Sequence, residues 1–372
     1  MVKRVKEKER LSKSRTSSKR NFKIFALFAV VLISATVLLL VLPCLPPKPP
    51  TTSPKHYQGV VEMWNVESFE GGSGSRQSWI TARAAQFEKK HEGTFVHVTT
   101  LSEEQLLAKL DEGENFDVIC FSRGVGCMVQ NLLQPYTGSV ADIKENLLVS
   151  GQVGSVVYAL PLYAGAYCLF ARESQLPANA DLLQTALTNV YTRKVGKNVY
   201  ELQPLICGFT ANNSPLTALA LSGVRGKCSL SEEVSQYSAY ENFVANKTAV
   251  TLLGTQRDLY RLQKREEAGK IEKLAFSPLV GYTDLVQYLA ISQLCGEKYA
   301  CCTEFLQFLT QEEAQQTLQN VNLFSVLQQT YYTDARYLAC ENGLFGAYVP
   351  NVFGDKGSIL QQRKTAIATL ET

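Results

Sequence analysis

The stretch from Gly59 to Phe87, "GVVEMWNVESFEGGSGSRQSWITARAAQF", decides the fold class. Residues 59–66 are predicted to form a strand, because β-branched and aromatic side chains gather there. A glycine-rich segment follows, which we call the glycine loop (residues 69–76). Beyond it, apolar side chains recur at helical spacing at Trp79, Ile80, Ala84 and Phe87. A strand, a loop and a helix in this order are typical of an α/β domain.

The same alternation continues along the chain in two sets. Residues 93–100 and 116–121 predict strands, and residues 102–113 between them predict a helix that begins with a capping box from Ser102 to Gln105. A second set of helices and strands follows residues 156–172. We therefore predict an α/β protein in which each set forms a mainly parallel sheet flanked by helices.

The N-terminus is predicted to tether the chain to a membrane. Residues 1–23 carry ten Lys and Arg against two Glu and form a basic tail, whereas residues 24–42 contain neither charge nor proline. At ~1.5 Å per residue this apolar segment crosses the ~30 Å hydrocarbon core, and the basic residues on its N-terminal side keep the tail in the cytoplasm. A cleaved signal peptide and a lipoprotein at Cys44 are the alternatives. An uncut anchor is favoured, because Pro43 stands where either cleavage needs a small residue.

The outer portion, which follows the anchor, begins with a proline-rich segment and is acidic. Residues 43–57 contain six of the thirteen prolines and predict a stiff, extended linker. The chain has a net charge of +3, and its basic tail exceeds that value, so the remainder is acidic. An acidic outer portion argues against a nucleic-acid partner, whose phosphates require a basic face.

The ten cysteines do not indicate a metal site. Cys120, Cys168 and Cys207 lie in apolar runs and are predicted to be core thiols. The pairing of the others stays open, including that of Cys295, Cys301, Cys302 and Cys340. There is no CxxC pair, and the three histidines lie apart from the cysteine cluster, so we expect neither a metal nor a cofactor.

The glycine loop lies where ligands bind in open α/β sheets, beyond the carboxyl end of a strand and at the start of a helix. Its glycines allow backbone N–H groups to approach a ligand, and Arg76 adds a forked donor. The loop matches neither a P-loop nor a dinucleotide fingerprint, in which a glycine would replace Gln77. A flexible surface loop is the alternative interpretation.

Four segments together resemble the extracellular solute-binding proteins of ATP-driven (ABC) importers, the maltose-binding-like group. These are "GSVVYALPLYAGAYCLFARESQLP" (154–177), "YENFVANKTAVTLLGT" (240–255), "CCTEFLQFLTQEEAQQTLQNVNLFSV" (301–326) and "YVPNVF" (348–353). Asn246 and Val250 depart from the usual glycine and methionine of the second segment. The similarity spans roughly residues 59–372.

The resemblance implies a two-lobed, type II periplasmic-binding-protein fold. Lobe one would comprise residues 58–160 plus 283–321, and lobe two residues 161–282 plus 322–372. The lobes would close on a small solute by a hinge motion. It further implies a monomeric, non-enzymatic protein that delivers its solute to the permease subunits of an importer. With the predicted anchor, this would be a single-pass protein of the cell membrane with the bulk of the chain on the extracytoplasmic side.

Candidate ligand contacts come from both lobes and from the crossings between them. They are Trp64, Glu70, Gly72, Ser73, Gly74, Ser75, Arg76, Ser122, Arg123, Tyr163, Tyr167, Asn212, Asn213, Ser214, Thr255, Gln256, Arg257, Tyr282 and Asp284. Three have plain alternatives, since Ser214 could only cap a helix, Trp64 could belong to the core, and Arg257 could lie on a solvated helix face.

The candidate set predicts a carbohydrate, with two alternatives. Aromatic faces beside amide and carboxylate groups suit sugars, whereas Arg76, Arg123 and Arg257 suit an anionic or phosphorylated solute. The same fold could also serve a sensor or adhesive surface protein, or a hydrolase that uses Ser73 or Ser75 with a carboxylate such as Glu70 or Asp284 as base.

Overall fold

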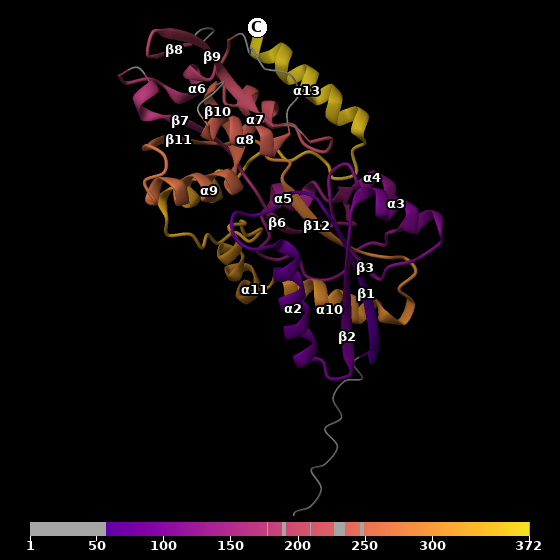
Figure 1. Ribbon diagram of the computed structural model, residues 1–372. Helices are drawn as coiled ribbons and strands as arrows, with labels where there is room; N and C mark the ends of the chain where they lie inside the picture. Colours follow the sequence, from indigo (N-terminus) through magenta and orange to yellow (C-terminus); the bar gives the residue numbers. More distant parts are fainter. Residues whose placement is uncertain are drawn as a thin grey trace, which may run out of the picture. The chain divides into compact units, whose positions relative to one another are not determined.

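The computed structural model describes residues 57–176, 178–187, 191–208, 210–226, 235–245 and 249–371 (Figure 1). The predicted basic tail, the apolar anchor and the linker, apart from residue 57, lie outside the described residues. Within the described part of the chain, no helix is both long and apolar enough to cross a bilayer.

Two five-stranded sheets organise residues 57–371. The first has the strand order β2-β1-β3-β12-β6. Its strands are β1 (Gly59–Val66), β2 (Thr94–Leu101), β3 (Val118–Ser122), β6 (Leu160–Ala164) and β12 (Val286–Ile291). The second has the order β11-β7-β10-β9-β8. Its strands are β7 (Tyr167–Arg172), β8 (Tyr191–Val195), β9 (Asn198–Cys207), β10 (Ala249–Thr255) and β11 (Leu274–Leu279).

The prediction of a mainly parallel sheet is right for the first sheet, in which only β12 runs against the other four strands, and wrong for the second. In the first sheet β1 runs parallel to β2 and β3, but β12 runs antiparallel to both β3 and β6. In the second sheet only β9 and β10 are parallel, while β7 is antiparallel to β10 and β11, and β8 and β9 form a hairpin. In the two five-stranded sheets, every antiparallel pair outside the β8–β9 hairpin involves β7 or β12, and each of these strands directly follows a crossing between the sheets.

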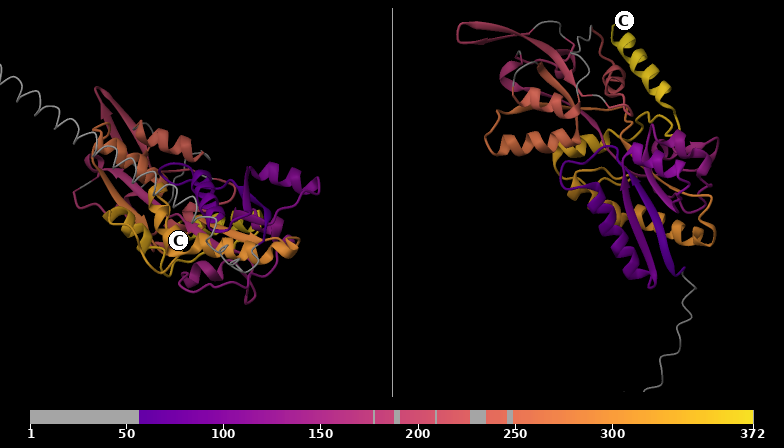
Figure 2. Two further views of the ribbon diagram at one scale, coloured as in Figure 1. Left: turned by 90° about the horizontal axis from the view of Figure 1, so that it is seen from below. Right: turned by 45° about the vertical axis from the view of Figure 1, so that its right-hand side comes forward.

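Helices flank both sheets. The helices around the first sheet are α2 (Arg76–Lys90), α3 (Glu103–Asp111), α4 (Gly126–Val129), α5 (Glu145–Val149), α10 (Tyr299–Thr310) and α11 (Glu312–Gln316). The same region contains the 3₁₀ turns η2 (Gln130–Leu132), η4 (Gly296–Lys298) and η5 (Thr317–Val321). It also contains a short hairpin of β4 (Gln152–Val153) and β5 (Val156–Val157). Around the second sheet lie α6 (Leu182–Thr185), α7 (Pro215–Leu221), α8 (Gln236–Val244), α9 (Gln256–Glu267), α12 (Ala335–Asn342) and α13 (Lys356–Glu371), with the 3₁₀ turn η3 (Glu173–Gln175). Figure 2 shows α13 as the long yellow helix at the C-terminus, and this helix packs against α7, which is far from it in sequence.

Helix α2 forms as its sequence predicts. Ser75 caps its N-terminus by accepting a hydrogen bond from the Ser78 backbone N–H at 3.4 Å, and Lys89 and Lys90 lie in its last turn, where cations are favoured. The predicted apolar face is buried and packs toward α10, with the Phe87 ring 5.0 Å from that of Phe305. The capping box of α3 between Ser102 and Gln105 is also present.

Three chain segments cross between the two sheets and bond to one another. The first lies between β6 and β7, the second between β11 and β12 (residues 280–285), and the last between η5 and α12 (residues 322–334). Backbone hydrogen bonds of 2.9 Å in both directions join Ala164 at the end of β6 to Phe324 in the last crossing. In the same place the Gly165 N–H donates to the Leu285 carbonyl at 2.6 Å. The first crossing thus falls at residues 165–166, after β6, rather than at the 160/161 boundary expected from the sequence, because β6 pairs with β12 of the first sheet.

Candidate functional site

The glycine loop lies at the junction of the two lobes. A side-chain carbon at Gly71 would overlap the Val321 carbonyl oxygen, and one at Gly72 would overlap Tyr260 of α9 in the second lobe. Gly74 has a φ of +62°, which favours glycine. Glycine is therefore required here because the loop backbone touches both Val321, directly before the last crossing, and the opposite lobe.

Glu70 and Arg76 close the loop upon itself. The Glu70 carboxylate accepts the Arg76 backbone N–H at 3.1 Å and pairs with the Arg76 Nε at 3.4 Å. The Arg76 side chain is only 2% exposed, and its Nη1 also donates to the Ser68 hydroxyl at 3.2 Å. The buried Tyr163 hydroxyl lies near this guanidinium without a well-formed hydrogen bond, and burial raises the pKa of Tyr163.

Gln256, at the start of α9, joins the second lobe to the loop and the crossing. Its backbone N–H donates to the Ala166 carbonyl at 3.1 Å, and its side-chain Oε1 accepts the Ala166 N–H at 3.0 Å. Its Nε2 donates to the Glu70 carbonyl at 3.4 Å. One fully buried side chain therefore bonds to the first crossing and to the glycine loop at once.

Asp284, in the second crossing, gathers donors from four parts of the chain. Its carboxylate accepts the Tyr167 hydroxyl at 2.6 Å, the Tyr282 hydroxyl at 2.8 Å and the Ser214 backbone N–H at 2.6 Å. The Arg123 Nη1, beyond β3 of the first lobe, lies 3.9 Å away. We call Asp284 and these four partners the Asp284 cluster.

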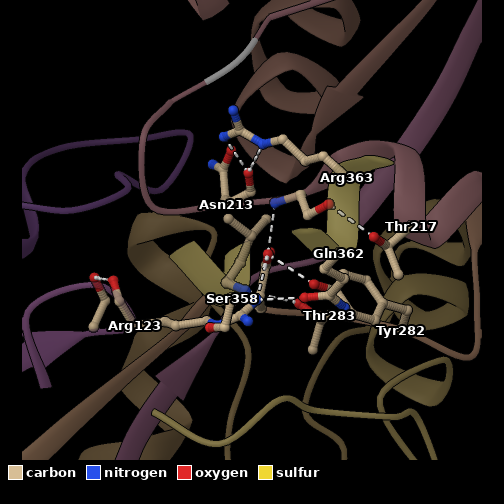
Figure 3. A network of polar contacts seen from close by, with 12 residues as sticks. Arg123, Asn213, Thr217, Tyr282, Thr283, Ser358, Gln362 and Arg363 are labelled. Atoms are coloured by element: carbon tan, nitrogen blue, oxygen red, sulfur yellow. Dashed lines mark hydrogen bonds and ion pairs between the residues drawn. The ribbon is translucent and has the colours of Figure 1, made fainter. Parts of the chain in front are cut away.

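Figure 3 shows how the last helix joins this cluster. The Arg123 Nη1 donates to the Gln362 side chain of α13 at 2.6 Å, so Arg123 spans the two lobes. Arg363 of the same helix donates through its Nε to the Asn213 carbonyl at 2.9 Å. Asn212 Nδ2 reaches across to the Glu103 carboxylate of α3 at 3.3 Å, and Lys356 pairs with the other oxygen of Glu103.

Burial sets the electrostatics of the junction. Desolvation raises the pKa of Asp284, although the hydroxyl bonds from Tyr167 and Tyr282 and the charge of Arg123 oppose that shift. Asp258 in the first turn of α9 is also buried, and desolvation raises its pKa to about 6. Both carboxylates are therefore held in a low-dielectric region where unpaired charge is costly.

Several candidate residues serve local structure. Trp64 packs on Phe116 in the core, with ring centroids 5.2 Å apart. The Ser75 and Thr255 side chains cap α2 and α9, and the Ser214 hydroxyl bonds to the Thr217 hydroxyl at 2.7 Å instead of a helix N–H. Ser122 is buried at the end of β3, and Ser73 donates its N–H to the Val321 carbonyl. Arg257 is half-buried, and the described residues offer its guanidinium neither a hydrogen bond nor an ion pair.

Sequence reasoning missed Tyr260, Gln362, Glu103 and Lys356. Tyr260 and Gln362 lie inside helices, and no local pattern distinguishes them from other helix residues. Glu103 follows the capping serine of α3, which explains its presence without a second role. Only the approach of the lobes reveals their contacts.

Two surface cavities, of about 570 and 550 Å³, are lined by residues outside the candidate set. The first lies between α10, α11 and the last crossing, and the second is lined by residues around Lys144 and Phe345. No candidate residue lines either cavity. Among the described residues, no group of three or more His, Cys, Asp or Glu side chains is placed to hold a metal ion.

Comparison with known proteins rests on structure alone. No family model matches the sequence, and no curated protein matches it. The fold is similar to that of maltose-bound MalE3 of T. maritima, with 13% identity, coverage of 84% of this chain and 98% of that one, and a TM-score of 0.57. It is also similar to the sugar-binding protein MalE of Xanthomonas citri, with 14% identity, coverage of 84% and 97%, and a TM-score of 0.56.

A third similar structure is that of iron-bound HitA from Pseudomonas aeruginosa, with 13% identity, coverage of 82% and 99%, and a TM-score of 0.50. At such low identities the similarity establishes the fold. The chain therefore has the two-lobed type II fold that its resemblance to solute-binding proteins implied.

Proposed function

We propose that this protein captures a small polar solute, a carbohydrate, between its two lobes and delivers it to the membrane subunits of an ABC importer. The observation that carries the proposal is the convergence of the glycine loop, all three crossings and the starts of α7 and α9 at one junction. Ligands of open α/β folds bind at such strand and helix ends.

The charges at the junction favour a neutral solute over an anion. Of the three arginines considered from sequence, Arg76 is paired with Glu70, and Arg123 faces Asp284. An anion would have to compete with these carboxylates at close range in a region of low dielectric. Of these three arginines, Arg257 is the one whose charge is left for a ligand, which is less than phosphate recognition usually employs.

The aromatic residues at the junction support a carbohydrate. The rings of Tyr167 and Tyr282 stack with centroids 6.4 Å apart, and Tyr282 stacks on Tyr348 at 6.1 Å. Tyr348 is more than half exposed, so the stack runs from the buried Asp284 cluster to the surface. Flat aromatic faces beside a carboxylate acceptor match the apolar faces and hydroxyl groups of a sugar ring.

The arrangement described is a closed one, in which the ligand-facing groups bond to one another. Asp284 is satisfied by protein donors, and Gly72 touches Tyr260 directly. Solute entry therefore requires the lobes to separate at the three crossings, and a solute that contacts both lobes would shift the balance between open and closed states.

The junction gives no support to the hydrolase alternative. The Ser75 hydroxyl caps α2, and the Glu70 carboxylate is bound to Arg76, so neither group is poised as nucleophile or base. The similar structures are described as sugar-bound, sugar-binding or iron-bound proteins, which agrees with a binding role. The proposal also includes a membrane tether and an outer location, which rest on the sequence of residues 1–42. The proposed permease partner rests on the fold.

A thermal-shift screen of the detergent-solubilised full chain tests the function, with Trp64 and Trp79 fluorescence as the readout. We expect malto- or manno-oligosaccharides to raise the Tm by several degrees, since a ligand at ~100 times its Kd adds ~2.7 kcal/mol. Tyr282→Phe should weaken the saccharide affinity by about tenfold, the effect of one lost hydrogen bond, and so roughly halve the Tm shift at the same saccharide concentration. Tyr299→Phe is the matched control, because the Tyr299 hydroxyl that it removes donates to the Pro135 carbonyl, far from the junction. A Tm that responds to phosphate, phosphosugars or Fe³⁺ but to no neutral saccharide would contradict the proposal.

A further inference from the structure

Two buried cysteines from distant parts of the chain touch inside the second lobe. The Sγ atoms of Cys168 in β7 and Cys340 in α12 lie 3.5 Å apart, although 172 positions separate the residues in sequence. Their exposed fractions are 0% and 1%. Contact between two thiols at this distance places them within reach of a bond, since a disulfide requires a small further approach to ~2.05 Å.

The surroundings of the pair are ordered secondary structure on both sides. Cys168 lies in the interior of the second sheet, paired with Gly254 of β10 and Pro278 of β11. Helix α12 packs against β11 and is capped at its start by Asp334, whose carboxylate accepts the Arg336 N–H at 2.9 Å. Both cysteines are therefore held in place by backbone pairing and helix packing, and neither depends on a loop.

We propose that Cys168 and Cys340 form a structural disulfide that fastens α12, after the last crossing, to the second sheet. The proposal rests on the outer location given under the proposed function, because disulfides persist in oxidising compartments. The bond would close a loop that contains the second and third crossings, and it would lower the entropy of the unfolded chain.

The oxidant is a disulfide, either a small-molecule disulfide such as oxidised glutathione or the disulfide of an exchange enzyme. One cysteine thiolate attacks it, forms a mixed disulfide and releases the first thiol. The second cysteine then attacks its partner's sulfur in the mixed disulfide and releases the second thiol. The two cysteines lose two electrons and two protons, and both are taken up by the oxidant as it becomes two thiols.

Formation belongs to the folding stage. Burial raises the pKa of Cys168 well above its usual value, so in the closed core this thiol stays protonated and a poor nucleophile. Oxidant access requires the sulfurs to be exposed, which they are before α12 packs on the sheet.

Peptide mapping of the full chain tests the proposal. The protein is refolded in detergent with reduced and oxidised glutathione, free thiols are blocked with N-ethylmaleimide under denaturing conditions, and the unreduced chain is digested for mass spectrometry. We expect a linked peptide that joins Cys168 to Cys340. Recovery of both cysteines carrying the blocking group, from protein with a cooperative thermal transition, would overturn the proposal.

Reduction of the folded protein provides a second measurement. We expect the Tm of the oxidised chain to fall by roughly 5–10 °C on reduction. The variants Cys168→Ala and Cys340→Ala should lose this response, whereas Cys120→Ala, a buried thiol of the first sheet, should keep it. If the single variants do not fold, the peptide map of the unaltered chain still decides. A chain that binds a saccharide with both thiols free would refute the disulfide alone, and a linked chain that binds none would refute the proposed function alone.

Discussion

Gly72 of the first lobe lies against Tyr260 of the second, so closely that a side-chain carbon at position 72 would overlap the Tyr260 Cβ. The nearest part of Tyr260 is the start of its side chain, which a rotamer change cannot move away. The closed arrangement of the lobes therefore depends on the absence of a side chain at this position.

Gly72→Ala should favour separation of the lobes. We expect a larger radius of gyration by small-angle X-ray scattering and a loss of about 1–3 kcal/mol of stability in the closed form, the usual cost of overpacking. Gly357→Ala is the matched control, because a Cβ there meets its nearest neighbour at an ordinary 3.4 Å. An unchanged radius of gyration in Gly72→Ala would show that the contact does not govern closure.

Asp284→Asn should destabilise the folded chain by about 2–4 kcal/mol. The amide group cannot accept the donors that now point at both carboxylate oxygens, and Arg123 loses its nearby charge. Glu62→Gln is the control, because the Glu62 carboxylate pairs with the exposed His97 ring. Urea unfolding of both variants measures the loss of unfolding free energy that each substitution causes. Equal effects from both substitutions would refute a special role of the Asp284 cluster.

Asp258 should make stability depend on pH in the acid range. Burial raises its folded pKa to about 6, above its unfolded value near 3.9, so its contribution is complete below the unfolded pKa and is lost as pH rises through 6. The loss amounts to about 3 kcal/mol at most, at ~1.4 kcal/mol per pKa unit.

Asp258→Asn should remove this pH dependence of stability. It should keep the helix cap, because the Thr255 N–H now donates to the Asp258 carboxylate at 2.9 Å and can donate to the amide oxygen of the variant. Urea midpoints between pH 4 and 7 provide the measurement. Asp181→Asn, at an exposed cap of α6, serves as control and should leave the slope in place. A variant with the unaltered slope would assign the pH dependence to other groups.

Lys144 should make the stability of the folded chain rise with pH in the alkaline range, whereas Asp258 makes it fall with pH in the acid range. Its ammonium group is buried against the Ser325 and Leu327 carbonyls and the Phe345 ring, and desolvation lowers its pKa to about 8. Its contribution to stability is therefore complete above the unfolded pKa near 10.4 and is lost as pH falls through 8.

Stability of the unaltered chain should thus rise between pH 7.5 and 9.5 by roughly 1–2 kcal/mol. Lys144→Met should abolish this rise in guanidinium unfolding, whereas Lys364→Met, on the exposed side of α13, should retain it. Persistence of the rise in Lys144→Met would place the titrating group elsewhere.

Local elements could be predicted from sequence because their causes lie within a few residues. The buried face of α2, the capping box of α3 and the glycine loop at the carboxyl end of β1 follow from spacing, capping chemistry and backbone freedom. The resemblance of four segments to solute-binding proteins also implied the two-lobed fold, which the similar structures establish.

Strand direction could not be predicted in the same way. An apolar strand such as β12 shows no sign of whether its neighbour runs with it or against it, so the sheets were predicted to be mainly parallel. Direction is set by the route of the chain between the two lobes, which is a property of the whole fold.

The sequence by itself determined which segments form helices and strands and where the backbone must be free, because propensity, capping and periodicity act between near neighbours. Only the tertiary structure decided that Asp284 meets Tyr167 and Arg123, that Gly72 meets Tyr260 and that Cys168 meets Cys340. These contacts join residues far apart in sequence, and they exist because three crossings bring the two lobes together.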